Sequence, residues 1–268
     1  MRFWSVWRRL AAALTLALAI GCNRPAPLEQ TPQTRTVRVA AASDLRYAFE
    51  GITAQLEQAR PDLDLQVAYG SSGTFFAQIV NGAPFDLFMS ADIDYPRQLA
   101  ARGLTMADSE FLYAVGRLVL WVPASSPVDV TSGLEALADP RVAYLSIANP
   151  EHAPYGRAAE AAMRQAKVYD RVKSKIVLGE NVSQALQFVQ SGAAQAGLVA
   201  LSLAIAPSVR PTGKFWEIPS TLHPQIDQAG VILKAAGDLE AARAVRAFLI
   251  GEGGRATLKQ YGFSLPGS

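Results

Sequence analysis

Hydrophobic positions in the first half of the chain follow two alternating patterns. Short apolar runs, the first with β-branched residues at its start, predict strands at residues 36–42, 63–69 and 86–90. Between them, apolar residues recur at helical spacing in residues 45–56 and 75–80, which predicts one amphipathic helix in each interval. Strands that alternate with helices are typical of a mostly parallel sheet with crossover helices. The first half therefore predicts an α/β unit.

The second half repeats this alternation after one unusually long apolar run. Residues 111–122 contain a single charge and are too long for an average strand, so we expect one strand that leaves a first lobe for a second. Further strands are predicted at 141–147, 176–178 and 194–200, and a strand at 229–233 would return to the first lobe. The expected fold is α/β and two-lobed, with two mostly parallel sheets, flanking helices and a ligand cleft. Lobe 1 comprises residues 36–118 and 225–268, and lobe 2 comprises residues 119–224.

Four loops are predicted at the ends of strands and the starts of helices, where open α/β sheets bind ligands. They contain Ser43 and Asp44, residues 70–74, residues 154–156 and residues 179–182. The first N–H groups of a helix have no partner inside the helix and lie at its positive end, so they favour anions. Considered alone, the Gly-Ser-Ser-Gly-Thr turn at 70–74 is also consistent with an ordinary serine N-cap. Together the loops predict a small oxyanion held mainly by neutral donors.

The N-terminal segment predicts export. Residues 10–20 are apolar except for one threonine and follow two arginines, a length that suits a signal peptide better than a membrane span. Residues 1–21 are therefore predicted to be a signal peptide. They end in Ala-Ile-Gly before Cys22, which resembles a bacterial lipobox and predicts a lipid anchor on Cys22; an ordinary secretory signal with an incidental cysteine is the alternative. Residues 22–35, rich in Pro, Gln and Thr, are predicted to be a flexible tether.

Composition narrows the function classes further. Half of the residues are hydrophobic and 18% are charged, which is typical of a globular protein. The formal charge of +2 includes three arginines ahead of Cys22, so the rest of the chain carries −1 and gives no support for nucleic-acid binding. Two histidines and one cysteine supply too few soft ligands for a metal-cation site, and no cofactor is expected.

Two long stretches carry a family resemblance. Residues 77–92 (Ala-Gln-Ile-Val-Asn-Gly-Ala-Pro-Phe-Asp-Leu-Phe-Met-Ser-Ala-Asp) and 149–156 (Asn-Pro-Glu-His-Ala-Pro-Tyr-Gly) resemble the periplasmic molybdate-binding proteins of ABC importers. Shorter matches occur at residues 39–43, 70–73 and 261–263. The resemblance implies a type II-like periplasmic-binding-protein fold and a monomer that binds molybdate, and tungstate as well. It also implies an ABC permease and its ATPase as partners, and a periplasmic location for a protein that is no enzyme.

The resemblance also implies the binding residues. Ser43 and Ser72 would each donate a hydroxyl and a backbone N–H, and Tyr155 and Val182 would each donate a backbone N–H. Ser71 and Asn181 are further candidates for the pocket, with Asn181 as a helix N-cap. Some family members place a tyrosine hydroxyl on the ligand directly after the strand at 194–199. This chain has Ala200 there, and Ser202 is the candidate replacement.

Asp44 is unexpected in an anion pocket. An ionised carboxylate beside a dianion is unfavourable by roughly several kcal/mol at a low effective dielectric constant. Its side chain is expected either to cap the helix near the N–H of Tyr47, with its charge paired to Arg46, or to line the pocket and tune which anion or protonation state is accepted.

Two alternatives stay open at this point. Neutral donors also suit sulfate or phosphate, so the protein could bind another oxyanion. A serine-dependent hydrolase would need a serine and a base, which His152 or His223 could supply. The Gly-Ser-Ser-Gly turn lacks the spacing of a Gly-x-Ser-x-Gly nucleophile elbow, and each histidine is expected to be a loop residue with a backbone hydrogen bond.

Overall fold

The computed structural model describes residues 34–267 of the chain. The predicted signal peptide (residues 1–21), Cys22 and nearly all of the predicted tether lie outside the described residues. Within the described part, no helix has the length and apolar character needed to cross a membrane.

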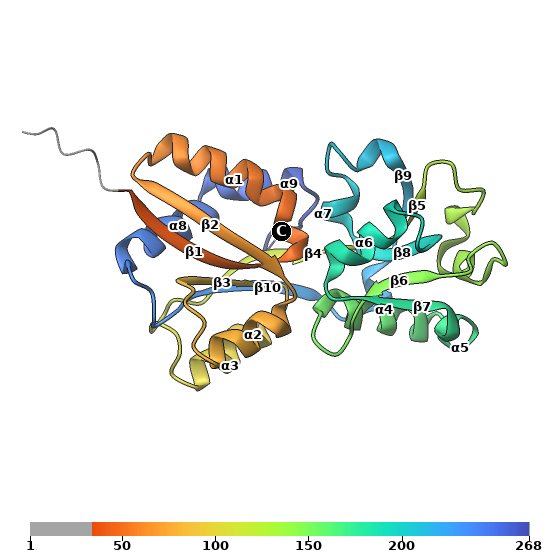
Figure 1. The fold of residues 1–268 in the computed structure, drawn as a ribbon, viewed down its shortest axis with the longest axis horizontal. Helices are drawn as coiled ribbons and strands as arrows, with labels where there is room; N and C mark the ends of the chain where they lie inside the picture. The colour runs from red at the N-terminus through yellow and green to blue at the C-terminus, as the bar shows by residue number, and fades with distance from the viewer. Residues whose placement is uncertain (1–33, 268) are drawn as a thin grey trace, which may run out of the picture. The chain divides into compact units, whose positions relative to one another are not determined.

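The first sheet has five strands in the order β2-β1-β3-β10-β4 (Figure 1). Strand β1 pairs in parallel with both β2 and β3, whereas β10 runs antiparallel to β3 and β4. The strand that breaks the parallel pattern is β10, which joins this sheet after the chain has passed through all the strands of the second sheet. The strands are β1 (Arg35–Ala42), β2 (Leu63–Gly70), β3 (Leu87–Ser90), β4 (Phe111–Gly116) and β10 (Ile226–Ile232).

Helices cover both faces of the first sheet, as Figure 1 shows. On one face, α1 (Arg46–Ala59), α8 (Leu239–Ile250) and α9 (Glu252–Gln260) enclose a core that includes Phe49 and Ile52. On the other face, α2 (Ser72–Val80) and α3 (Asp94–Ala101) pack around a smaller core. The apolar helix face predicted for residues 45–56 is fully buried. The helical spacing of apolar residues therefore correctly predicted which side of α1 faces the core.

The second sheet repeats the plan in the order β7-β6-β8-β5-β9. Strands β6, β7 and β8 are parallel, and β5, which arrives from the first sheet, runs antiparallel to β8 and β9. We call the elements around the first sheet lobe 1 and those around the second sheet lobe 2. The lobe 2 elements are β5 (Leu118–Pro123), β6 (Leu145–Ala148), β7 (Ile176–Gly179), β8 (Ala196–Ala200), β9 (Gly213–Glu217), α4 (Pro154–Gln165), α5 (Tyr169–Val172), α6 (Val182–Gln190) and α7 (Leu201–Ala204).

Two sequence-based expectations about strands were wrong. The run at 111–122 is two strands, β4 and β5, separated at Arg117, because the first half pairs only within the first sheet and the second half only within the second. The carbonyl of Arg117 accepts a hydrogen bond from the N–H of Leu201 at 2.9 Å, outside either ladder. The edge strand β9 was not expected, since its residues are only partly buried and lack a continuous apolar pattern.

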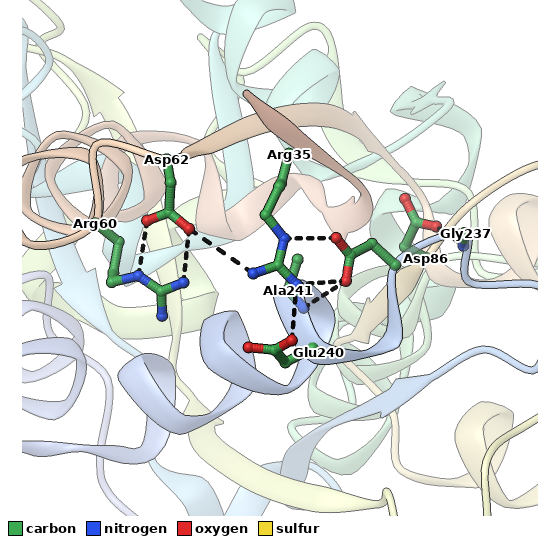
Figure 2. Close-up of polar contacts among 8 residues, drawn as sticks. Arg35, Arg60, Asp62, Asp86, Gly237, Glu240 and Ala241 are labelled. Atoms are coloured by element: carbon green, nitrogen blue, oxygen red, sulfur yellow. Dashed lines mark hydrogen bonds and ion pairs between the residues drawn. The ribbon is translucent and has the colours of Figure 1, made fainter. Parts of the chain in front are cut away.

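A group of ion pairs fastens the start of β1 to the start of α8, as Figure 2 shows. The guanidinium of Arg35 donates to both carboxylate oxygens of Asp238, at 2.6 and 2.7 Å, and lies 3.4 Å from Glu240. Asp238 also caps α8 by accepting the N–H of Ala241 at 2.9 Å. The Arg35 side chain therefore holds the pKa of the Asp238 carboxyl well below its ordinary value.

We expect an Arg35→Ala protein to unfold at a lower temperature than wild type near neutral pH. A lowered carboxyl pKa contributes stability that is present above the unfolded-state pKa and is lost as pH falls through the folded-state pKa. The loss in the variant should therefore shrink between about pH 7 and about pH 3. Thermal unfolding at several pH values, followed by circular dichroism, measures the loss of stability and its dependence on pH. Arg255→Ala is the control, since Arg255 has no ion pair within residues 34–267; an equal loss in this control, or a loss independent of pH, would contradict the prediction.

Candidate functional site

The four predicted loops meet at one small cavity between the lobes. Lobe 1 supplies the segments after β1 and β2, and lobe 2 supplies the starts of α4 and α6. The cavity is small: the space open to the centre of a water molecule is about 10 Å³, far too little for a peptide or a sugar. The lining residues are Ala42, Ser43, Asp44, Gly70, Ser71, Ser72, Ala91, Ala153, Pro154, Tyr155, Asn181 and Val182.

Four residues that line this cavity lie in the first turn of a helix: Ser43, Ser72, Tyr155 and Val182. The first N–H groups of a helix have no acceptor within the helix and lie at its positive end. The cavity is therefore surrounded by helix starts, which favour an anion.

Capping side chains hold two of these helix starts. Ser71 caps α2 by accepting the N–H of Thr74, at 3.3 Å, and Asn181 caps α6 by accepting the N–H of Gln184, at 3.1 Å. A cap of this kind satisfies the third N–H of the first turn and leaves the first one free. In α4 the first position is Pro154, which has no N–H, so the donor at the cavity is that of Tyr155.

Two serine hydroxyls add donors to the cavity. The Oγ of Ser72 accepts the N–H of Ala91 at 2.9 Å, and the Oγ of Ser43 accepts the N–H of Ser183 at 3.3 Å. Because each oxygen acts as an acceptor in the protein, its own proton is free to point elsewhere. Ser183, which also donates its hydroxyl to the carbonyl of Ser43 at 2.9 Å, was not among the predicted site residues, since nothing in its sequence surroundings marks it.

Asp44 is buried at the wall of the cavity and 1% exposed. Its Oδ2 accepts the hydroxyl of Tyr155 at 3.0 Å and the amide of Gln228 at 2.5 Å. Burial is the main cause that raises the pKa of Asp44 to about 6, and these two hydrogen bonds act in the opposite direction. The expected helix cap is therefore wrong: the side chain caps no helix and pairs with no arginine among residues 34–267.

Ser202 and Ala200 lie near the site without lining the cavity. The hydroxyl of Ser202 donates to the backbone carbonyl of Asp44 at 2.8 Å, so it ties α7 to lobe 1 and does not face the cavity as expected. Ala200, the position at which some relatives carry a tyrosine, ends β8 and is fully buried. Tyr155 does line the cavity, and its hydroxyl donates to Asp44.

Comparison with known proteins shows the family to which the chain belongs. Residues 37–264 match the family model described as bacterial extracellular solute-binding protein. The chain belongs to this family. It is 37% identical over 252 residues to the molybdate-binding protein ModA of Azotobacter vinelandii, covering 93% of this chain and 97% of that one, and 34% identical to ModA of Rhodobacter capsulatus, covering 94% and 95%. The solved structure of the Azotobacter vinelandii periplasmic molybdate-binding protein superposes with a TM-score of 0.81 at 32% identity, covering 86% of this chain and 99% of that one.

In this solute-binding protein, the two lobes contact each other directly around the cavity. The N–H of Gly73 on α2 donates to the carbonyl of His152 at 2.9 Å, and the hydroxyl of Thr74 donates to Glu180 at 2.9 Å. The guanidinium of Arg157 on α4 pairs with Asp92 and also donates to the hydroxyl of Tyr95, at 3.3 Å. No lysine or arginine lines the cavity itself.

We expect an Arg157→Ala protein to bind its solute about two- to fivefold more weakly, because a partly exposed ion pair contributes little and here favours the closed arrangement of the lobes. Titration calorimetry measures the change. Arg164→Ala is the matched control, since Arg164 pairs with Glu160 on the same helix and does not connect the lobes. Equal affinities of the two variants would show that the pair with Asp92 does not act on closure.

Proposed function

We propose that this protein binds molybdate, and tungstate as well, on the extracytoplasmic side of the cell envelope and delivers the anion to an ABC importer. The observation that carries the proposal is the convergence of four helix starts on one cavity, joined by the hydroxyls of Ser43 and Ser72. The names of the relatives at 34–37% identity support the choice of anion.

The neutral donors at the cavity account for the binding of an ionised oxyanion. Helix N-termini stabilise negative charge through their dipoles and free N–H groups. The ligand residues in this proposal are Ser43, Ser72, Tyr155 and Val182. Ser71 and Asn181 hold the helix starts in place, as their capping bonds suggest.

Capture requires the lobes to separate and close. In the proposal, residues 36–118 with 225–268 move as one body and residues 119–224 as the other. The open form exposes the serines of lobe 1, and closure adds the N–H groups of Tyr155 and Val182. A ligand shifts such an equilibrium only through contacts that differ between the two forms, and these lobe 2 donors are the difference.

The deciding experiment is titration calorimetry of the purified protein with molybdate, tungstate, sulfate and phosphate. We expect binding of molybdate and tungstate and at least a hundredfold weaker binding of the other two. Binding of sulfate or phosphate with no heat from molybdate would overturn the assignment in favour of another oxyanion.

The proposed role includes no catalysis, although one contact resembles part of a serine hydrolase. The Oγ of Ser71 lies 2.8 Å from Nδ1 of His152, whose Nε2 lies 3.5 Å from Glu180. Ser71 is buried and also caps α2, and the histidine bonds join the two lobes, so we assign the group to closure. Turnover of a p-nitrophenyl ester that is lost in Ser71→Ala would contradict this.

We also propose that the protein is a monomeric lipoprotein anchored through Cys22, with an ABC permease and its ATPase as partners. The lipobox-like sequence before Cys22 supports the anchor. Labelled palmitate supplied to cells should be incorporated into the wild-type chain and absent from Cys22→Ser.

A further inference from the structure

The Asp44 side chain connects three segments that are distant in the sequence. It follows β1 in lobe 1, accepts the hydroxyl of Tyr155 from α4 in lobe 2, and accepts the amide of Gln228 from β10. The amide of Gln228 also lies 3.3 Å from the Tyr155 hydroxyl, so the three side chains form one buried cluster against the cavity. Tyr155 also lines the cavity, at the start of α4.

Two acceptors in this cluster have no donor. The Oδ1 of Asp44 and the Oε1 of Gln228 are both fully buried and without a hydrogen-bond partner among residues 34–267. A buried acceptor without a donor is unfavourable, and more so when it belongs to an ionised carboxylate. A proton on Asp44 would remove the charge and turn its free oxygen into a donor.

We propose that Asp44 takes up one proton when the oxyanion binds, so that a neutral carboxyl becomes an additional donor at the cavity. This inference rests on the proposed function. It makes Asp44 a specificity-determining residue: in its neutral form it replaces the donor that Ala200 cannot supply, and in its ionised form it repels the dianion.

The surroundings of Asp44 favour proton uptake when an anion binds. Burial already raises its pKa to about 6 without any anion, and a negative charge in the adjacent cavity raises it further. The titratable groups that face it are Tyr155 on α4 and Tyr113 on β4, whose pKa values burial raises well above 10, so both stay neutral near physiological pH. No lysine, arginine or histidine within residues 34–267 forms an ion pair with Asp44.

The test is calorimetric titration with sodium molybdate between about pH 6 and pH 9, in buffers of different ionisation enthalpy. The dependence of the observed heat on the buffer counts the protons exchanged. We expect uptake of nearly one proton per anion at about pH 8, and an affinity that falls by about tenfold per pH unit above the pKa of the free protein. No proton uptake together with a flat pH profile would overturn the inference.

Two variants separate Asp44 from other sources of pH dependence. Asp44→Asn carries a neutral amide in place of the carboxyl, so its affinity should be independent of pH, exceed that of wild type at about pH 8 and involve no proton. Tyr155→Phe keeps the backbone N–H but removes a hydrogen bond that favours the ionised carboxylate, so its pH midpoint should move upward. A pH profile of Asp44→Asn identical to that of wild type would overturn the inference.

Anion binding and proton uptake can be rejected separately. Absence of binding to molybdate, tungstate, sulfate and phosphate at every pH would reject the proposed function and this inference with it. Tight binding of molybdate with no proton exchange would reject the inference alone. The ligand-free protein gives an independent readout: because burial raises the pKa of Asp44, wild type should lose thermal stability relative to Asp44→Asn as pH rises from about 4 to about 6.

Discussion

A Val182→Pro protein is expected to bind molybdate about ten- to a hundredfold more weakly than wild type and to remain folded. Val182 is the first residue of α6, a position at which proline fits the helix and removes only an N–H that the helix does not use. Its predecessor Asn181 is extended (φ −150°, ψ 175°), the conformation that a following proline favours. A hydrogen bond to a charged group contributes about 1.5–3 kcal/mol, which gives the expected loss.

The matched control for this prediction is Val182→Ala, which shortens a buried side chain but keeps the N–H. It should lose some thermal stability and little affinity, whereas the proline variant should show the reverse. Calorimetry with molybdate and thermal unfolding of the ligand-free proteins measure the two effects. If Val182→Pro bound molybdate as tightly as Val182→Ala, the N–H of Val182 would not be a ligand donor.

The helix starts at the cavity were predictable because their signals are local. Ser71 and Asn181 each directly precede a helix, which is where side-chain caps occur. These two and the other two helix starts follow strands of the two α/β lobes and converge by topology, since ligands of open α/β sheets lie outside the carboxyl ends of the strands. The location of the cavity thus follows from short-range patterns combined with one fold rule.

The chemistry around Asp44 was not predictable in this way. Its partners Tyr155 and Gln228 are 111 and 184 residues away in sequence, and each belongs to a different element. Gln228 lies in an apolar strand and is the one polar residue there that is completely buried, which in hindsight is a signal of a partner in the core. Nothing local identifies that partner as Asp44.

The division of residues 111–122 into two strands was missed for a related reason. Hydrophobic pattern reports burial, and the side chains from Leu118 to Val122 are as buried as those of a central strand. It does not report which sheet a strand joins, because that depends on pairing with β10 on one side of Arg117 and with β8 and β9 on the other.

A Gly73→Ala protein is expected to bind molybdate more than tenfold more weakly because its lobes cannot close. A Cβ at Gly73 would lie 2.6 Å from the backbone carbonyl oxygen of His152 in lobe 2, closer than real Cβ contacts. It would also lie 2.7 Å from the hydroxyl of Tyr95, a side chain of lobe 1 that can rotate away. The clash with His152 is relieved only when the lobes separate, and alanine favours the helix, so lobe 1 should fold at least as well as in wild type.

Small-angle scattering with and without molybdate tests the closure directly, and calorimetry gives the affinity. Wild type should become more compact on adding molybdate, whereas Gly73→Ala should stay at the radius of gyration of the free protein even when saturated. Gly51→Ala on α1 is the control, because a Cβ there meets only Thr257 at 3.4 Å, an ordinary contact, and no lobe 2 atom. Wild-type compaction of Gly73→Ala at saturating molybdate would show that the lobes can close around the added methyl group.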